Sequence, residues 1–231
     1  MPRRLLALLS PPTCWSCGAC AAPGQPLCDR CDHALPWLGE RQASAPLIPR
    51  RDERDGSERR RTLGAGAHLD QLWTPLAFDG PARDLVHALK FRGAPGLAAA
   101  MAWHVLDGAP RDLLSPPAAI VPVPAHAWRR RARGFDHAEA LALELGRASG
   151  RPVIASLRRA GGTSAHQRGL DRAERLAGRG LTVETLGCVV PRCAVLVDDV
   201  CTTGATLTAC ARALRAAGAS SVSAIAYARA L

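Results

Sequence analysis

The chain has 231 residues, of which 48% are apolar, and its formal net charge is +10. This is enough to bury one full hydrophobic core with one small appendage, so a single main domain is expected. No stretch reaches the roughly 18 to 20 uninterrupted apolar residues of a membrane span, which excludes membrane insertion by a helix.

The first ten residues combine two arginines with a short apolar run, as a secretory signal peptide does. However, no small-residue cleavage site follows before the first proline and cysteine residues. We therefore expect a cytoplasmic protein, in which cysteines serve metal binding or burial rather than disulfide formation.

Four of the nine cysteines form two C-x2-C pairs in a short segment rich in Pro and Gly. The pairs are Cys14 with Cys17 and Cys28 with Cys31. Four thiolates at this spacing are typical of a structural Zn2+ site with tetrahedral geometry. A redox-active dithiol is the alternative, because each pair could also cycle as a disulfide. Cys20 forms a further C-x2-C with Cys17, and its part in the metal site stays open.

The sequence changes character after residue 38, where scattered prolines precede a charged run that includes Arg59 to Arg61. A segment with so few apolar residues cannot bury a core face. We therefore expect a zinc-binding module over residues 1–38, a flexible charged linker over residues 39–67 and the main domain over residues 68–231.

Helix and strand patterns alternate through the main domain. Helices are predicted over residues 81–91, 98–106, 137–148 and 204–217, and strands over residues 118–123, 152–154, 181–183, 193–197 and 221–227. This alternation predicts an α/β domain with a mostly parallel sheet. In such sheets, ligands bind outside the carboxyl ends of the strands.

The strand predicted over residues 193–197 leads into two carboxylates and a Thr- and Gly-rich loop that opens a helix. The carboxylates are Asp198 and Asp199, and the loop contains Thr202, Thr203, Gly204, Ala205 and Thr206. Backbone N–H groups and hydroxyls at a helix N-terminus can cradle a phosphate. Carboxylates accept hydrogen bonds from vicinal hydroxyls or from hydrated Mg2+. Ribose 5-phosphate carries both kinds of group; the alternative is an ordinary buried strand followed by a capped helix.

Residues 195–206 resemble the phosphoribosyl pyrophosphate motif of type I phosphoribosyltransferases. Further segments resemble the ComF family (competence protein F, or GntX-like) of that fold: the lysine motif at 88–93, the P-V-P element at 121–124, the R-G-F-N-Q element at 131–138 and the T-x3-Q-x2-L-x4-R stretch at 163–175. Asp136 and His137 depart from the family's Asn and Gln. The resemblance covers nearly the whole chain except the linker.

The resemblance implies a type I phosphoribosyltransferase fold in which Asp198 and Asp199 contact the ribose hydroxyls, as the catalytic carboxylates if the protein is an enzyme. Residues 202–206 would bind the 5-phosphate, and Mg2+ would accompany the pyrophosphate. Lys90 and Arg133 are candidates for the pyrophosphate itself. Lys90 is the one lysine among 30 basic residues, and a phosphate favours a compact ammonium. Chance placement at a helix end and a solvated surface arginine are the alternatives.

Three functions stay open. The favoured one is a ComF-type protein that binds phosphoribosyl pyrophosphate or a related ribose phosphate and is linked to DNA uptake in natural competence. The second is an active phosphoribosyltransferase, a glycosyltransferase whose nitrogenous acceptor is unknown. The third is a single-stranded DNA-binding factor without catalysis, with a DNA-uptake helicase as the partner that the resemblance implies. The arginine cluster at residues 129–133 is compatible with binding a phosphate backbone.

Overall fold

The computed structural model describes residues 13–44, 68–91, 94, 96–125, 134–160, 182–187 and 189–231. Several predicted features lie outside these ranges. They are most of the linker (45–67), both arginine clusters, the pyrophosphate candidate Arg133 and the stretch 163–175.

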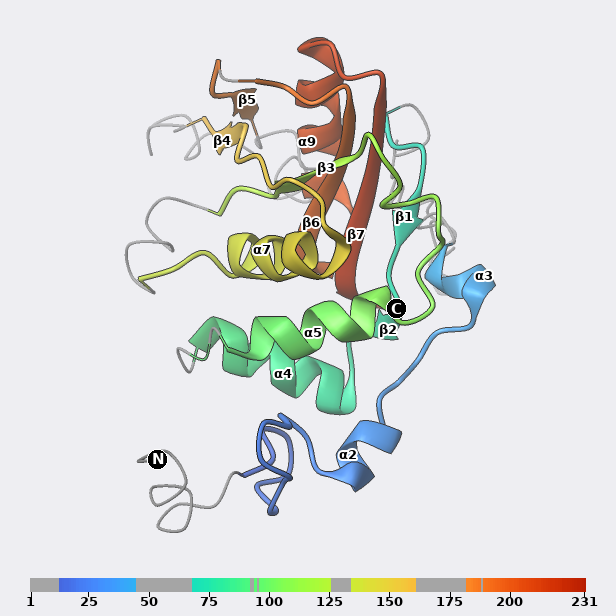
Figure 1. Cartoon of the computed structure of the whole chain (residues 1–231), viewed down its shortest axis with the longest axis vertical. Helices are drawn as coiled ribbons and strands as arrows, with labels where there is room; N and C mark the ends of the chain where they lie inside the picture. The colour runs from blue at the N-terminus through green and yellow to red at the C-terminus, as the bar shows by residue number, and fades with distance from the viewer. Residues whose placement is uncertain are drawn as a thin grey trace, which may run out of the picture.

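A five-stranded sheet forms the centre of the main domain, and all its pairings are parallel (Figure 1). The strand order is β1 (Leu72–Trp73), β7 (Ser221–Arg229), β6 (Cys193–Cys201) and β3 (Ala119–Pro122), and β2 (Leu76–Ala77) also pairs with β7. Most residues of β6 and β7 are buried, because helices cover both faces of the sheet. The predicted α/β architecture with a mostly parallel sheet is confirmed.

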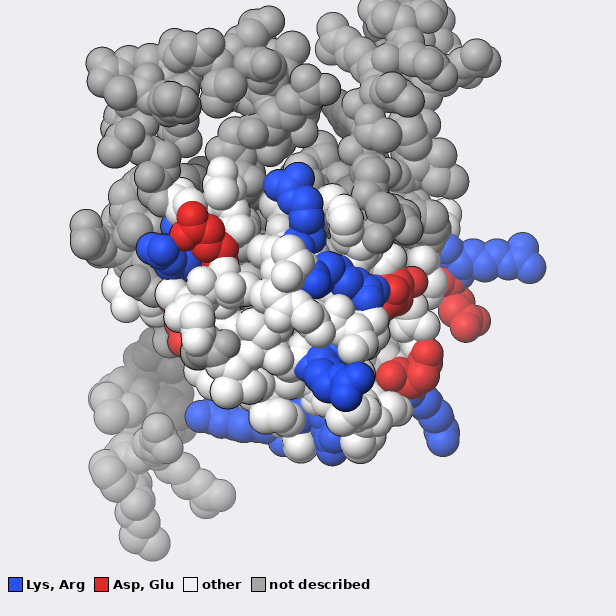
Figure 2. Space-filling view, turned by 90° about the horizontal axis from the view of Figure 1, so that it is seen from above, with Lys and Arg blue, Asp and Glu red and all other residues white. Residues whose placement is uncertain are grey.

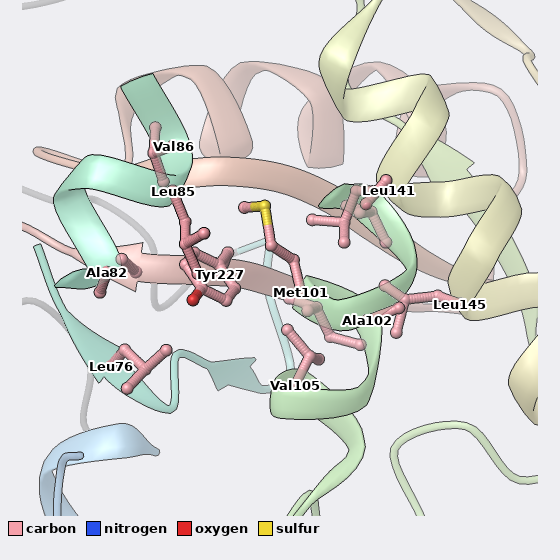
Figure 3. Close-up of a cluster of buried hydrophobic side chains, with 14 of the residues drawn as sticks. Leu76, Ala82, Leu85, Val86, Met101, Ala102, Val105, Leu141, Leu145 and Tyr227 are labelled. Atoms are coloured by element: carbon pink, nitrogen blue, oxygen red, sulfur yellow. The ribbon is translucent and has the colours of Figure 1, made fainter. Parts of the chain in front are cut away.

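Helices α4 (Gly80–Phe91), α5 (Leu97–Leu106) and α7 (His137–Ser149) pack on one face of the sheet. Helix α4 buries Ala82, Leu85, Val86 and Leu89, the i, i+3, i+4, i+7 spacing of an amphipathic helix. Figure 3 shows side chains of these helices gathered around Tyr227 of β7. The predicted helices over residues 81–91, 98–106 and 137–148 are thus confirmed.

Helix α9 (Ala205–Ala216) packs on the opposite face, where Leu207 and Leu214 join a second core with Leu196. Close to α9, β4 (Leu157–Arg159) and β5 (Val183–Thr185) form a separate antiparallel pair. Of the strands predicted nearby, residues 152–154 make only a single parallel bridge, between Val153 and Ile120.

The cysteine segment packs against α4 and α5, which lie between it and the sheet (Figure 1). Cys14, Leu27, Cys31 and Leu35 belong to the same buried cluster as the residues of those helices. The segment includes helix α2 (Asp29–His33). It therefore shares a core with the main domain.

Residues 40–43, which the sequence assigns to the linker, form helix α3 (Glu40–Ala43). The carbonyl of the fully buried Ala43 accepts hydrogen bonds from the backbone N–H of Thr74, at 2.9 Å, and from its hydroxyl, at 3.2 Å. Ordered structure thus extends beyond residue 38, because this turn is anchored beside β1. None of the helices in the described ranges is long and apolar enough to span a membrane.

Candidate functional site

The connections that follow β3 and β6 diverge to opposite faces of the sheet. After β3, the chain passes through α7 to Val153, which pairs with β3 on the side away from β6. After β6, it passes through α9 to β7 on the other side. Adjacent parallel strands with diverging connections leave a crevice outside their carboxyl ends, which is the usual ligand site of open α/β sheets.

Strand β6 continues through both predicted carboxylates, and its pairing with β7 extends to Cys201 and Arg229. The strand is therefore longer than the predicted range 193–197. Because side chains alternate along a strand, Asp198 and Asp199 point to opposite faces of the sheet. Asp199 lies on the face of α4 and α7, and Asp198 lies on the face of α9 with Leu196.

The loop between β6 and α9 presents two exposed threonines, Thr202 and Thr203. Gly204 precedes the helix with a φ of 69°, a left-handed conformation that favours glycine. Thr203 Oγ1 accepts a hydrogen bond from the backbone N–H of Ala205, at 3.4 Å. The first turn of α9 thus opens towards the crevice, and its N–H groups lack carbonyl partners within the helix. The structure brings the predicted residues 202–206 together at this helix N-terminus.

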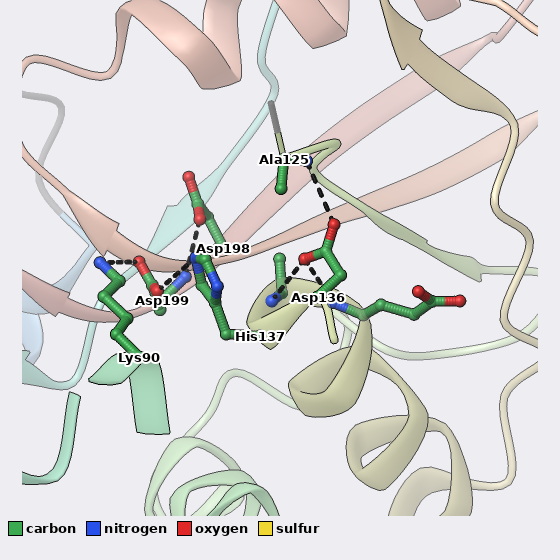
Figure 4. A network of polar contacts seen from close by, with 8 residues as sticks. Lys90, Ala125, Asp136, His137, Asp198 and Asp199 are labelled. Atoms are coloured by element: carbon green, nitrogen blue, oxygen red, sulfur yellow. Dashed lines mark hydrogen bonds and ion pairs between the residues drawn. The ribbon is translucent and has the colours of Figure 1, made fainter. Parts of the chain in front are cut away.

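Asp199 lies against the side chains of a lysine and a histidine, as Figure 4 shows. Lys90 Nζ at the end of α4 lies 2.9 Å from Asp199 Oδ1, and His137 Nε2 at the start of α7 lies 3.0 Å from Oδ2. Asp199 as a whole residue is 3% exposed. Burial alone would raise the pKa of Asp199, but His137 and Lys90 outweigh it and lower that pKa.

Asp198 is partly exposed, and its Oδ1 accepts a hydrogen bond from the backbone N–H of Asp199, at 2.9 Å. Loss of hydration raises the pKa of Asp198 to about 7, and the neighbouring Asp199 charge adds to the shift. The pair is therefore unequal: Asp199 stays ionised in an ion-pair cluster, whereas Asp198 exchanges its proton near neutral pH.

Asp136 ties the exit of β3 to the start of α7. Its carboxylate accepts hydrogen bonds from the backbone N–H groups of Ala138 and Glu139, at 3.0 and 3.4 Å, as an N-cap does. It also accepts one from Ala125, at 3.2 Å, beyond the end of β3 (Figure 4). This link fixes the position of His137, the next residue.

Lys90, predicted to contact pyrophosphate, lies against Asp199 in the structure. The sequence did not assign a role to His137, because nothing in its spacing connects the start of α7 with the end of β6. Asp136 was likewise noted only as a departure from a family pattern. The Ser, Thr, Asn or Asp preference at helix N-caps could have identified it.

The predicted metal ligands Cys14, Cys17, Cys28 and Cys31 do come together. Their sulfur atoms all lie within 4.8 Å of one another, so they could hold a metal ion. Although burial opposes the shift, backbone N–H groups of the turn, together with Cys17, lower the pKa of Cys14 to about 6. An easily ionised thiol suits metal ligation. Cys20 is exposed and lies outside this group of four.

A groove of about 740 Å³ runs between the cysteine segment and α5. Its walls include Trp15, Gln25, Leu97 and Trp103. None of the predicted ligand-binding or metal-binding residues lines it. The candidate site is thus defined by the sheet topology and the loop before α9 rather than by this groove.

No protein-family model matches this chain, and no curated protein matches it either.

Proposed function

We propose that the crevice at the carboxyl ends of β3 and β6 binds the ribose 5-phosphate part of phosphoribosyl pyrophosphate, or a related ribose phosphate. The observation that carries this proposal is the continuous unit formed by β6, the loop and α9. It combines a partly exposed carboxylate, Asp198, with exposed Thr202 and Thr203 at a helix N-terminus, where the sheet connections diverge.

The crevice offers suitable hydrogen-bonding groups to both the phosphate and the ribose of the ligand. A phosphate accepts hydrogen bonds from unpaired N–H groups and from threonine hydroxyls, and the helix dipole favours its negative charge. Vicinal ribose hydroxyls donate hydrogen bonds to a carboxylate, which Asp198 supplies. Mg2+ would be held mainly by the pyrophosphate of the ligand and by water, as hard cations prefer oxygen ligands.

Within this proposal the chain is a ComF-type protein of the type I phosphoribosyltransferase fold, and its link to DNA uptake rests on the sequence resemblance. If it catalyses a transfer, the bond from the anomeric carbon to pyrophosphate breaks while a nitrogen nucleophile attacks that carbon. Mg2+ would neutralise the departing pyrophosphate. The residues of this chain would hold the ribose and the 5-phosphate in position.

Binding of single-stranded DNA stays a prediction without a structural observation that favours it. On the face shown in Figure 2, Lys and Arg side chains are scattered among Asp and Glu side chains on a mostly uncharged surface, over the described residues. Exposed ion pairs such as Arg158 with Glu184 are of this mixed kind. A surface that binds a nucleic-acid backbone typically carries a continuous patch or stripe of basic side chains.

For the cysteine cluster, we propose that the metal is Zn2+. Four sulfur ligands without a carboxylate or open position favour a structural zinc site over Mg2+ or Ca2+. The metal content of purified protein, measured by mass spectrometry, should be one zinc per chain; protein prepared under metal-replete, reducing conditions without bound zinc would contradict this assignment.

Calorimetric titration with Mg2+ and phosphoribosyl pyrophosphate tests the ligand proposal. Asp198→Asn should weaken binding by roughly tenfold or more, because hydrogen bonds to a charged acceptor contribute about 1.5 to 3 kcal/mol. Asp107→Asn is the matched control, since it makes the same charge change at an exposed position after α5. Equal binding by the two variants would contradict the proposal.

A further inference from the structure

Three residues from three separate elements meet around one buried carboxylate: Lys90 from α4, Asp199 from β6 and His137 from α7 (Figure 4). Their side chains are 21%, 4% and 12% exposed, respectively. A buried carboxylate is costly unless cations accompany it, and here both oxygens face a nitrogen. The cluster therefore keeps Asp199 ionised and fixed.

The same geometry turns the Asp199 carboxylate away from the loop before α9. Its carboxylate points to the α4 and α7 face, whereas the loop before α9 and Asp198 lie towards the other face. Asp199 Oδ1 pairs with Lys90 at 2.9 Å, Oδ2 lies 3.0 Å from His137 Nε2, and the carboxylate is buried on this face.

Asp199 nevertheless controls its neighbour through the backbone. Its N–H donates the 2.9 Å hydrogen bond that orients Asp198 Oδ1. Any shift of the Asp199 peptide therefore moves the carboxylate proposed to bind ribose. Lys90 and His137 fix that peptide from the opposite side of the sheet.

We infer that Lys90 and His137 are positioning residues that clamp Asp199, and through its peptide N–H set the carboxylate of Asp198 for ribose binding. This inference rests on the proposed function and deepens it. It gives Lys90 a role on the ribose side of the ligand rather than a contact with pyrophosphate. It also assigns a role to His137, whose ring nitrogen Nε2 faces Asp199.

Two ligands separate these roles, ribose 5-phosphate and phosphoribosyl pyrophosphate, each titrated with Mg2+ by calorimetry. Lys90→Met removes the charge at similar side-chain length. If Lys90 positions Asp199, affinity for both ligands falls by a similar factor, roughly tenfold, as expected when a hydrogen bond to a charged group is misplaced. A loss confined to phosphoribosyl pyrophosphate identifies a pyrophosphate contact and overturns the inference.

His137 is tested by conservative rescue. His137→Gln retains an N–H donor towards Asp199, so its affinity for ribose 5-phosphate should stay within about threefold of wild type, whereas His137→Leu should lose roughly tenfold. Equal affinities for His137→Leu and wild type would overturn the role of this residue. Arg83→Met is the matched control for Lys90→Met, because it removes a positive charge from the same helix, α4, without touching the cluster.

Folding is checked by thermal unfolding of every variant. Should Lys90→Met fail to fold, the double variant Lys90→Met/Asp199→Asn takes its place, since it removes the buried carboxylate along with its cation. If Lys90 is a positioning residue, the affinity of the double variant for both ligands falls by the same factor. A loss of affinity for phosphoribosyl pyrophosphate alone again overturns the inference.

Wild-type protein that binds neither ligand refutes the proposed function itself. Wild-type protein that binds both, with Lys90→Met and His137→Leu unchanged, refutes only the inference.

Discussion

Ser16, between two of the clustered cysteines, donates a hydrogen bond from Oγ to Asp84 Oδ2 of helix α4, at 2.7 Å. The last turn of the same helix carries Lys90, which pairs with Asp199 in the candidate site. The cysteine segment is therefore attached to the helix that supplies a charged residue of the site. Its stability and that of the main domain should be linked.

Cys28→Ser should lose the metal and lower the melting temperature of the whole protein. Leu27 and Leu35 are buried in the same cluster as α4, and exposing a leucine costs about 1.5 to 3 kcal/mol. A loss of this size corresponds to roughly 3 to 12 °C in a chain of this length. Cys20→Ser, outside the cluster, should keep both metal and melting temperature. Independent unfolding of an unchanged main domain in Cys28→Ser would contradict the shared core.

Binding of the ribose phosphate should strengthen as the pH rises through about 7, the pKa to which loss of hydration and the neighbouring Asp199 charge raise Asp198. The ionised carboxylate is the better hydrogen-bond acceptor, so affinity should fall by up to about tenfold per pH unit below that value. The same titration of Asp198→Asn measures the pH dependence that comes from protonation of the ligand itself. A wild-type pH profile that parallels that of Asp198→Asn would refute this role.

Acid stability should depend on Asp199. The pKa of this carboxyl is lowered in the folded state below 3.8, so its stabilising effect is present above pH 4 and is lost as the pH falls further. Asp199→Asn should cost roughly 3 kcal/mol at pH 7, as a buried ion pair is broken. Urea unfolding at pH 7 and at pH 3 measures the difference, which should shrink at the lower pH. An equal difference at both pH values would show that the carboxylate charge is not the stabilising group.

Asp136→Ala should destabilise the protein by about 1 kcal/mol through loss of the α7 N-cap, whereas Asp136→Asn should restore most of it. Thermal unfolding of both variants provides the comparison. Equal melting temperatures for Asp136→Ala and wild type would mean that the cap contributes nothing to stability.

Local patterns were enough to predict most of the secondary structure. The apolar spacing in α4 and the buried run of β6 both follow from side-chain periodicity, and the two C-x2-C pairs predicted the cluster of four thiols. Strands β1 and β2 were not predicted, because each has two residues, too few to show an alternation of apolar and polar side chains.

The arrangement of the site depended on contacts between distant residues. The strand was predicted to end before Asp198, because carboxylates are unfavourable inside a buried strand. Lys90 and His137 remove that penalty at Asp199, so β6 continues and the two carboxylates separate onto opposite faces. Neither partner is within fifty residues of Asp199 in the sequence, so no local pattern could have predicted their contact.

The most direct test is a backbone amide NMR titration with ribose 5-phosphate. The account predicts that the largest shifts fall on the N–H groups of Thr203, Gly204, Ala205 and Thr206, where the phosphate accepts hydrogen bonds. Shifts concentrated instead at Trp15 and Trp103, in the groove beside the cysteine segment, or absent at saturating ligand, would contradict it.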